Sequence, residues 1–138
     1  MLAAIIEDDS GYREVIKDCM DDTDWNIIYF PNSFAFEEAD WSKYDAVVCD
    51  YYIPMINGME LLKKVWDKGH RPDMALMSGY LESIKGLYKP YINQIIDKAN
   101  PKEIKDWLDY VRIKKEVNNK IDQEITQLTR IRNEEKGH

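Results

Sequence analysis

Five short apolar runs recur along the chain, and most of them end at a charged or hydroxyl-bearing residue. The apolar residues are continuous rather than alternating, which is typical of strands in a parallel sheet that is covered on both faces. The runs predict strands over residues 2–6, 25–30, 45–50, 73–77 and 93–97.

Between these runs the apolar residues follow the period of a helix. After the first run they occupy the i, i+3, i+4, i+7 and i+8 positions of one stripe. This stripe comprises Tyr12, Val15, Ile16, Cys19 and Met20. Asp9 or Ser10 can cap the start of the helix. A short helix is predicted near residues 34–39 and a weak one over residues 80–88.

Two more helices carry explicit start signals. Asn57 with Glu60 three residues later is a capping-box arrangement, and Gly69 ends the helix that follows it. The stretch Asn-Pro-Lys-Glu at 100–103 combines a cap, a proline and an acid in the same way. Strands that alternate with helices predict a three-layer, doubly wound α/β fold with five parallel strands.

The predicted strand ends bring polar side chains to one place. Glu7 and Asp8 follow the first strand, Asp50 ends the third, Ser78 follows the fourth and Lys98 follows the fifth. Ligand sites in doubly wound folds lie at the carboxyl ends of the strands, where the strand order reverses. We therefore expect these side chains to form one site.

The residue types at these strand ends suit a cation and a phosphoryl group. Three carboxylates in one cleft repel each other unless they share a proton or bind a cation. All-oxygen ligands without histidine or cysteine favour Mg²⁺. With Lys98 and the Ser78 hydroxyl, such a site can hold phosphoryl oxygens, and one carboxylate can act as nucleophile at phosphorus.

Composition and charge narrow the remaining classes. A length of 138 residues fits one globular domain, and a net charge of −7 argues against general affinity for nucleic acid or anionic membranes. No apolar run approaches the length of a membrane span, and the acidic N-terminus is unlike a signal peptide. Cys19 and Cys49 fit two buried thiols in a reducing compartment. These features predict a cytoplasmic protein.

Taken together, the motifs resemble the receiver domain of bacterial two-component response regulators. The acidic pair in "IIEDD" matches, as does "DYYIPMING", with Pro54 four residues and Gly58 eight residues after Asp50. Ser78, with the small Gly79 behind it, and Lys98 match the family's hydroxyl and lysine positions. The resemblance covers residues 1 to 115 and implies a flavodoxin-like sheet of order 2-1-3-4-5.

The resemblance also implies a role for each residue. Asp50 would accept a phosphoryl group from a histidine kinase or a phosphotransfer protein. Asp8 would bind Mg²⁺ directly, and Glu7 would bind it directly or through water, together with Asp50 and the backbone carbonyl of Tyr52. Ser78 and Lys98 would hold the phosphoryl group. Such a protein is a signalling domain that phosphorylates and dephosphorylates itself rather than a conventional enzyme.

The sequence departs from the family pattern in three places. Ala99 follows Lys98 where the family usually has proline. Ile95 stands where an aromatic switch residue is usual, and Tyr88 or Tyr91 could substitute for it. The two positions that tend to tune dephosphorylation are tyrosines, at 52 and 80.

Other functions fit the sequence less well. A haloacid-dehalogenase-like phosphatase needs a second acid two residues after Asp50, where Tyr52 stands. A flavodoxin needs a phosphate loop after the first strand, where Glu7 and Asp8 would repel phosphate. The remaining alternative is a receiver-like module that binds other proteins and no longer turns over phosphate. The departures at Ala99 and Ile95 favour this alternative, whereas the complete set of acidic residues argues against it.

The C-terminal residues predict a helical extension. We assign residues 1–115 to the receiver domain and 116–138 to the extension, because no glycine or proline interrupts the chain between Pro101 and Gly137. An apolar line continues through Val117, Ile121, Leu128 and Ile131, with Ile125 beside it. We expect this stripe to mediate dimerisation or partner binding. Packing against its own domain and a frayed linker are the alternatives.

Overall fold

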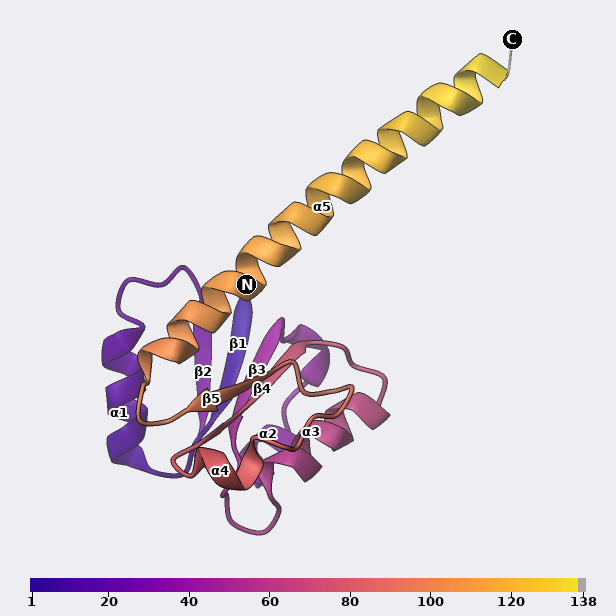
Figure 1. The fold of residues 1–138 in the computed structure, drawn as a ribbon. Coiled ribbons are helices and arrows are strands. Elements are labelled where there is room, and N and C mark those ends of the chain that lie inside the picture. The colour runs from indigo at the N-terminus through magenta and orange to yellow at the C-terminus, as the bar shows by residue number, and fades with distance from the viewer. Residues whose placement is uncertain (137–138) are drawn as a thin grey trace. The chain divides into compact units, whose positions relative to one another are not determined.

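The computed structural model describes residues 1–136, and it contains one parallel sheet (Figure 1). Its strands are β1 (Leu2–Ile6), β2 (Asn26–Phe30), β3 (Ala46–Asp50), β4 (Asp73–Ser78) and β5 (Gln94–Asp97). They lie in the order β2-β1-β3-β4-β5, and every neighbouring pair is parallel. The predicted doubly wound fold and its strand order are therefore confirmed.

The helices form the two outer layers. They are α1 (Ser10–Cys19), α2 (Ser33–Glu37), α3 (Gly58–Asp67), α4 (Leu81–Ile84) and α5 (Lys102–Lys136), with a 3₁₀ turn η1 at Trp41–Lys43. Figure 1 shows α1 and the start of α5 on one face of the sheet, and α2, α3 and α4 on the other. The central strands β1, β3 and β4 are almost entirely buried, as their continuous apolar sequences predict.

The capping residues define where the helices begin. The Asp9 side chain accepts a hydrogen bond from the amide of Tyr12, so Asp9 is the N-cap of α1. Asn57 accepts from the amide of Glu60 at 2.9 Å and donates to the Glu60 carboxylate at 3.0 Å. The predicted capping box at the start of α3 is thus confirmed. Helix α5 begins at Lys102, directly after the predicted cap and proline at Asn100 and Pro101.

Two predicted helices differ from the structure. Val15 of α1 is 43% exposed, while Ile16 and the C-cap residue Met20 are buried. The helix contacts the sheet along a narrower stripe than the sequence pattern suggested. Helix α4 ends at Ile84 rather than near residue 88. Gly86 and Pro90 lie in the irregular segment that follows, and both residue types disfavour a helix interior.

The chain divides into two compact units after Leu108. The first contains the whole sheet, and the second consists of the later turns of α5. The long C-terminal helix is confirmed, whereas the proposed boundary at residue 115 stays a prediction. Within the described residues, no helix combines the length and apolarity that crossing a bilayer requires.

Candidate functional site

The carboxyl ends of the strands place five predicted residues beside one another. Asp50 and Ser78 are the last residues of β3 and β4, and Lys98 follows β5. Among residues 1–136, the buried polar side chains are Glu7, Ser33, Asp50 and Ser78, and three of these four belong to the predicted site. Burying polar groups away from water is costly unless they are paired, so their concentration at one edge makes it the candidate functional site.

Charged atoms from three strand ends meet in this site. Carboxylate oxygens of Glu7, Asp8 and Asp50 all lie within 4.8 Å of one another. The ammonium nitrogen of Lys98 lies 2.7 Å from Oε2 of Glu7 and 3.1 Å from Oδ2 of Asp50. Burial acts to lower the pKa of Lys98, but its contacts with Glu7 and Asp50 raise that pKa above its usual value. Lys98 is therefore a fixed positive charge.

Glu7 shows that the cluster fits a cation. Its side chain is fully buried, and Oε1 accepts a hydrogen bond from the amide of Asp9 at 3.1 Å. Oε2 is contacted by the Lys98 ammonium at 2.7 Å, in an ion pair that occupies one of its two lone pairs. Oε2 thus keeps a lone pair available to a cation.

The electrostatics of Glu7 agree with this reading. Burial raises the pKa of Glu7 from 4.5 to about 7. The contact with Lys98 lowers this pKa, and the negative charge of Asp50 raises it further. The cluster also contains three carboxylates and one ammonium. A hard divalent cation with oxygen ligands such as Mg²⁺ suits this donor set.

Removing the Glu7 charge is expected to stabilise the metal-free protein. The unfolded state loses the Glu7 proton at a lower pH than the folded state does, so the free energy of unfolding falls as pH rises from 4.5 to about 7. We expect Glu7→Gln to remove this dependence and to raise the free energy of unfolding above pH 7 by about 1–3 kcal/mol. Urea denaturation in EDTA across this pH range measures it.

Glu38→Gln is the matched control, because Glu38 is exposed and lies outside the site. An unchanged pH profile in Glu7→Gln would contradict the raised pKa of Glu7.

The start of α3 approaches the phosphoacceptor candidate closely. The amide of Gly58 donates to the carbonyl of Tyr51 at 2.9 Å. A Cβ atom on Gly58 would overlap the backbone carbonyl of Asp50, so only glycine fits here. In the connecting loop, Met55 has a φ of 77° directly after Pro54, as in a type II turn. Pro54 and Gly58 therefore shape the loop that lets α3 begin close to Asp50.

Tyr12 belongs to the site, which the sequence pattern did not indicate. Its hydroxyl donates to the carbonyl of Lys98 at 2.8 Å, and its ring centroid lies 4.4 Å from the Lys98 ammonium. The Lys98 amide also donates to the carbonyl of Ser78 at 3.0 Å. After Lys98, the side chain of Asp97 accepts from the amide of Ala99 at 2.9 Å. Tyr12 and Asp97 thus hold the loop that lacks the family's usual proline.

Three tyrosines connect the loops on either side of Asp50 and Ser78. Tyr51 packs against the core, whereas Tyr52 and Tyr80 are 52% and 75% exposed. The rings of Tyr52 and Tyr80 lie edge to face with centroids 6.4 Å apart. The Tyr52 hydroxyl donates to Ser83 of α4 at 3.0 Å. The loop after β3 is therefore tied to the start of α4.

The aromatic candidates for the switch position lie in different surroundings. Tyr91 is buried, and its ring centroid lies 6.2 Å from that of Trp66. Tyr88 is 71% exposed, and Ile95 packs at the edge of the core. Tyr91 is thus a core residue, and Tyr88 is the aromatic residue of the pair that is open to solvent.

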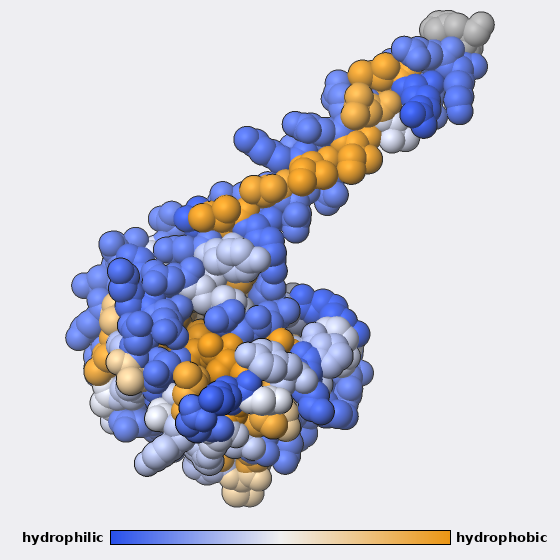
Figure 2. All heavy atoms as spheres, viewed as in Figure 1, coloured by the Kyte–Doolittle hydropathy of each residue, from blue (hydrophilic) through white to orange (hydrophobic). Residues whose placement is uncertain are grey.

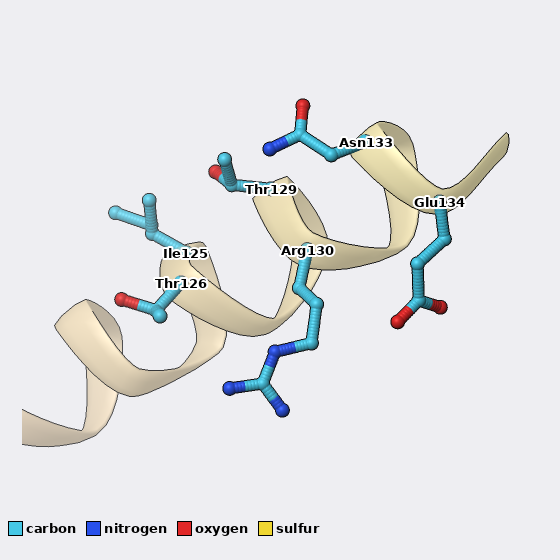
Figure 3. Close-up of a pocket in the computed structure, with 6 residues that line it drawn as sticks. All are labelled: Ile125, Thr126, Thr129, Arg130, Asn133 and Glu134. Atoms are coloured by element: carbon cyan, nitrogen blue, oxygen red, sulfur yellow. The ribbon is translucent and has the colours of Figure 1, made fainter. Parts of the chain in front are cut away.

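Surface hollows along α5 contain none of these site residues. Figure 3 shows one that is lined by Ile125, Thr126, Thr129, Arg130, Asn133 and Glu134. All six residues come from a single helix, so the hollow is a groove between neighbouring side chains rather than an enclosed cavity. It contains no buried charged group and is not a candidate active site.

Comparison with known proteins identifies the family. Residues 3–109 match the family described as the response regulator receiver domain. The chain belongs to this family. None of the curated proteins matches the chain.

Solved structures of receiver domains share the fold. The Thermotoga maritima response regulator TrrA, in complex with Mg(2+)-BeF, is 20% identical, with a TM-score of 0.69 over 80% of this chain and 97% of that one. The receiver domain of an HD domain-containing protein from Pseudomonas fluorescens Pf-5 is 12% identical, with a TM-score of 0.70 over 86% of this chain and 91% of that one. The non-phosphorylated HemR receiver domain of Leptospira biflexa is 22% identical, with a TM-score of 0.64 over 80% of this chain and 92% of that one.

Proposed function

We propose that this receiver domain accepts a phosphoryl group on Asp50 from a phosphohistidine of a histidine kinase or a phosphotransfer protein. The observation that carries the proposal is the position of Asp50. Its carboxylate is buried at the end of β3, lies 3.1 Å from the Lys98 ammonium and shares a 4.8 Å cluster with Glu7 and Asp8. The family match over residues 3–109 supports the same function.

Each side chain has a defined task in this reaction. A carboxylate oxygen of Asp50 attacks phosphorus, the phosphorus–nitrogen bond breaks, and the leaving imidazole takes a proton. Lys98, which already pairs with Asp50, attracts the phosphoryl oxygens. The Ser78 hydroxyl accepts from the amide of Tyr80 at 2.9 Å, so its own proton is available to a phosphoryl oxygen.

Glu7, Asp8, Asp50 and the backbone carbonyl of Tyr52 would hold Mg²⁺. The Mg²⁺-BeF complex of the Thermotoga maritima relative supports this assignment by fold analogy. When bound, the cation offsets the repulsion between the carboxylates and polarises the phosphoryl oxygens. Of the three carboxylates in this cluster, Asp50 would be the one that also forms the bond to phosphorus.

Labelling with a small phosphodonor tests the proposal. We expect the full chain to gain one phosphoryl group from acetyl phosphate or phosphoramidate when Mg²⁺ is present, and none in EDTA, because uncompensated carboxylates repel an anionic donor. Intact mass spectrometry measures the gain. Equal labelling with and without Mg²⁺ would contradict the metal site. No labelling under either condition would favour an interaction module that works without phosphate turnover.

The phosphoryl group is expected to be long-lived because of the two exposed tyrosines. Hydrolysis needs a water molecule in line with the bond between Asp50 and phosphorus. Tyr52 and Tyr80 lie in the loops after β3 and β4, and their rings contact each other, so we expect them to hinder the approach of this water. We expect Tyr52→Ala and Tyr80→Ala each to speed dephosphorylation severalfold, by about 3- to 10-fold. Loss of the phosphoryl group over time, followed by mass spectrometry after donor removal, gives the rates.

Two variants sharpen this measurement. Tyr88→Ala removes a ring that is about as exposed as that of Tyr80 and, within residues 1–136, stacks against neither Tyr52 nor Tyr80, so it should leave the rate unchanged. Tyr52→Phe keeps the ring but removes the hydrogen bond to Ser83, which separates shielding from tethering of the loop. Unchanged or slower loss in both alanine variants would rule out shielding.

The helical extension is proposed to provide a second function. We assign residues 1–115 to the phosphorylated domain and 116–138 to an extension that binds a second copy or another protein. The support is the row of exposed apolar residues on α5, which includes Val117, Ile121 and Leu128.

A further inference from the structure

The part of α5 beyond Leu108 carries an apolar stripe that is exposed along its length. Its members are Tyr110, Ile113, Val117, Ile121, Ile125, Leu128 and Ile131, each between 43% and 66% exposed. At roughly 100° per residue, they fall within an arc of about 120° on one face of the helix. Figure 2 shows the aliphatic members as a nearly continuous band. A helix of this length with one bare apolar face is marginal in water and needs a partner.

Two charged residues share the stripe and have opposite signs. Among residues 110–131, Lys114 and Glu124 are the charged residues whose positions fall within the same arc. The Lys114 ammonium lies 5.7 Å from the ring centroid of Tyr110, so this side chain runs along the stripe. In a heptad frame, Lys114, Ile121 and Leu128 occupy a positions, and Tyr110, Val117, Glu124 and Ile131 occupy d positions.

The placement of these charges distinguishes the two ways in which identical helices can pair. In a parallel pair each residue faces its own copy, so Lys114 would meet lysine and Glu124 would meet glutamate inside the apolar seam. Like charges there are costly. In an antiparallel pair centred near residue 119, a positions face d positions of the other chain. Lys114 then faces glutamate, and apolar positions face apolar ones.

We propose that this segment pairs with the same segment of a second copy of the chain as an antiparallel coiled coil. Val117 packs against Ile121 of the second copy, Tyr110 against its Leu128, and Lys114 pairs with its Glu124. Each of these layers occurs twice by symmetry. The proposal specifies the partner and orientation of the extension discussed above. It does not depend on phosphorylation of Asp50.

Charge reversal in the full-length chain tests the pairing. We expect Lys114→Glu and Glu124→Lys each to weaken dimerisation about tenfold or more in sedimentation equilibrium, because each places like charges in the seam. The double variant restores the opposite-sign pair and should dimerise as the parent does. Arg130→Glu is the matched control, since Arg130 leaves the helix on a different side from Ile125 (Figure 3).

Nitroxide labels measure the orientation. Arg130→Cys in a Cys19→Ser background provides the labelling site, while Cys49 is buried. In the antiparallel pair the two labelled positions lie about 33 Å apart along the helix axis, at 1.5 Å per residue, whereas in a parallel pair they lie at the same level.

Three results would overturn the proposal: a monomeric parent chain at the highest concentration reached, labels at the same level, or a double variant no better than the single ones. Circular dichroism verifies that each variant keeps its helices. Phosphodonor labelling of Lys114→Glu is expected to match that of the parent, so a failed dimer leaves the phosphorylation proposal intact.

Discussion

Asp50→Asn is expected to abolish labelling by a small phosphodonor. An amide lacks the negative charge and the nucleophilic oxygen that the reaction requires, while it keeps the size of the side chain. No other buried carboxylate can replace it easily. Glu7 lies deeper, with one oxygen bonded to the amide of Asp9 and the other beside Lys98. We therefore expect the mass of the variant to stay unchanged under conditions that modify the parent completely.

The matched control for this experiment is Asp67→Asn. Asp67 is an exposed acid at the end of α3 that pairs with Lys63, and it lies outside the strand-end cluster. We expect this variant to accept one phosphoryl group as the parent does. Labelling of Asp50→Asn to the same extent as Asp67→Asn would assign the phosphoacceptor to another residue and would overturn the proposed function.

Gly58→Ala is expected to damage both stability and phosphorylation. The added methyl group would overlap the carbonyl oxygen of Asp50 and lie 3.0 Å from a methyl carbon of Leu76. Because backbone atoms cannot rotate out of the way as a side chain does, either α3 or the end of β3 must shift. We expect the free energy of unfolding to fall by about 2–3 kcal/mol in urea denaturation.

The same shift should slow phosphodonor labelling, because Asp50 would lose its alignment with Lys98 and the other carboxylates. Gly79→Ala provides a close comparison. Gly79 directly follows Ser78, yet a Cβ atom there meets nothing within 4 Å. We expect it to change the free energy of unfolding by less than about 0.5 kcal/mol. If the two variants lose similar stability, the close approach of α3 to Asp50 is not the cause.

The strands and most of the site follow from the sequence because they depend on local signals. Buried strands such as β3 consist of adjacent apolar residues, and a charge at the end of such a run is conspicuous. The parallel topology then brings Glu7, Asp50 and Lys98 together without any knowledge of side-chain conformation.

The features that the sequence did not indicate depend on where the end of a side chain lies in the folded protein. Tyr12 fits the apolar period of α1, which predicts that its ring is buried. The pattern does not predict where its hydroxyl lies, and this hydroxyl donates to the carbonyl of Lys98. The exposure of Val15 depends on how much surface the neighbouring elements cover. The periodicity of apolar residues predicts which residues can be buried, and tertiary packing determines which of these residues are buried.

The residue before the phosphoacceptor gives the protein an internal reporter. Cys49 is a free thiol, fully buried in the central strand β3, and burial raises its pKa well above the usual value. A thiol in that state reacts with alkylating reagents only when its strand opens. Cys19, which is only partly buried, needs no such opening. The ratio of the two alkylation rates therefore measures how often the strand that carries Asp50 separates from its neighbours.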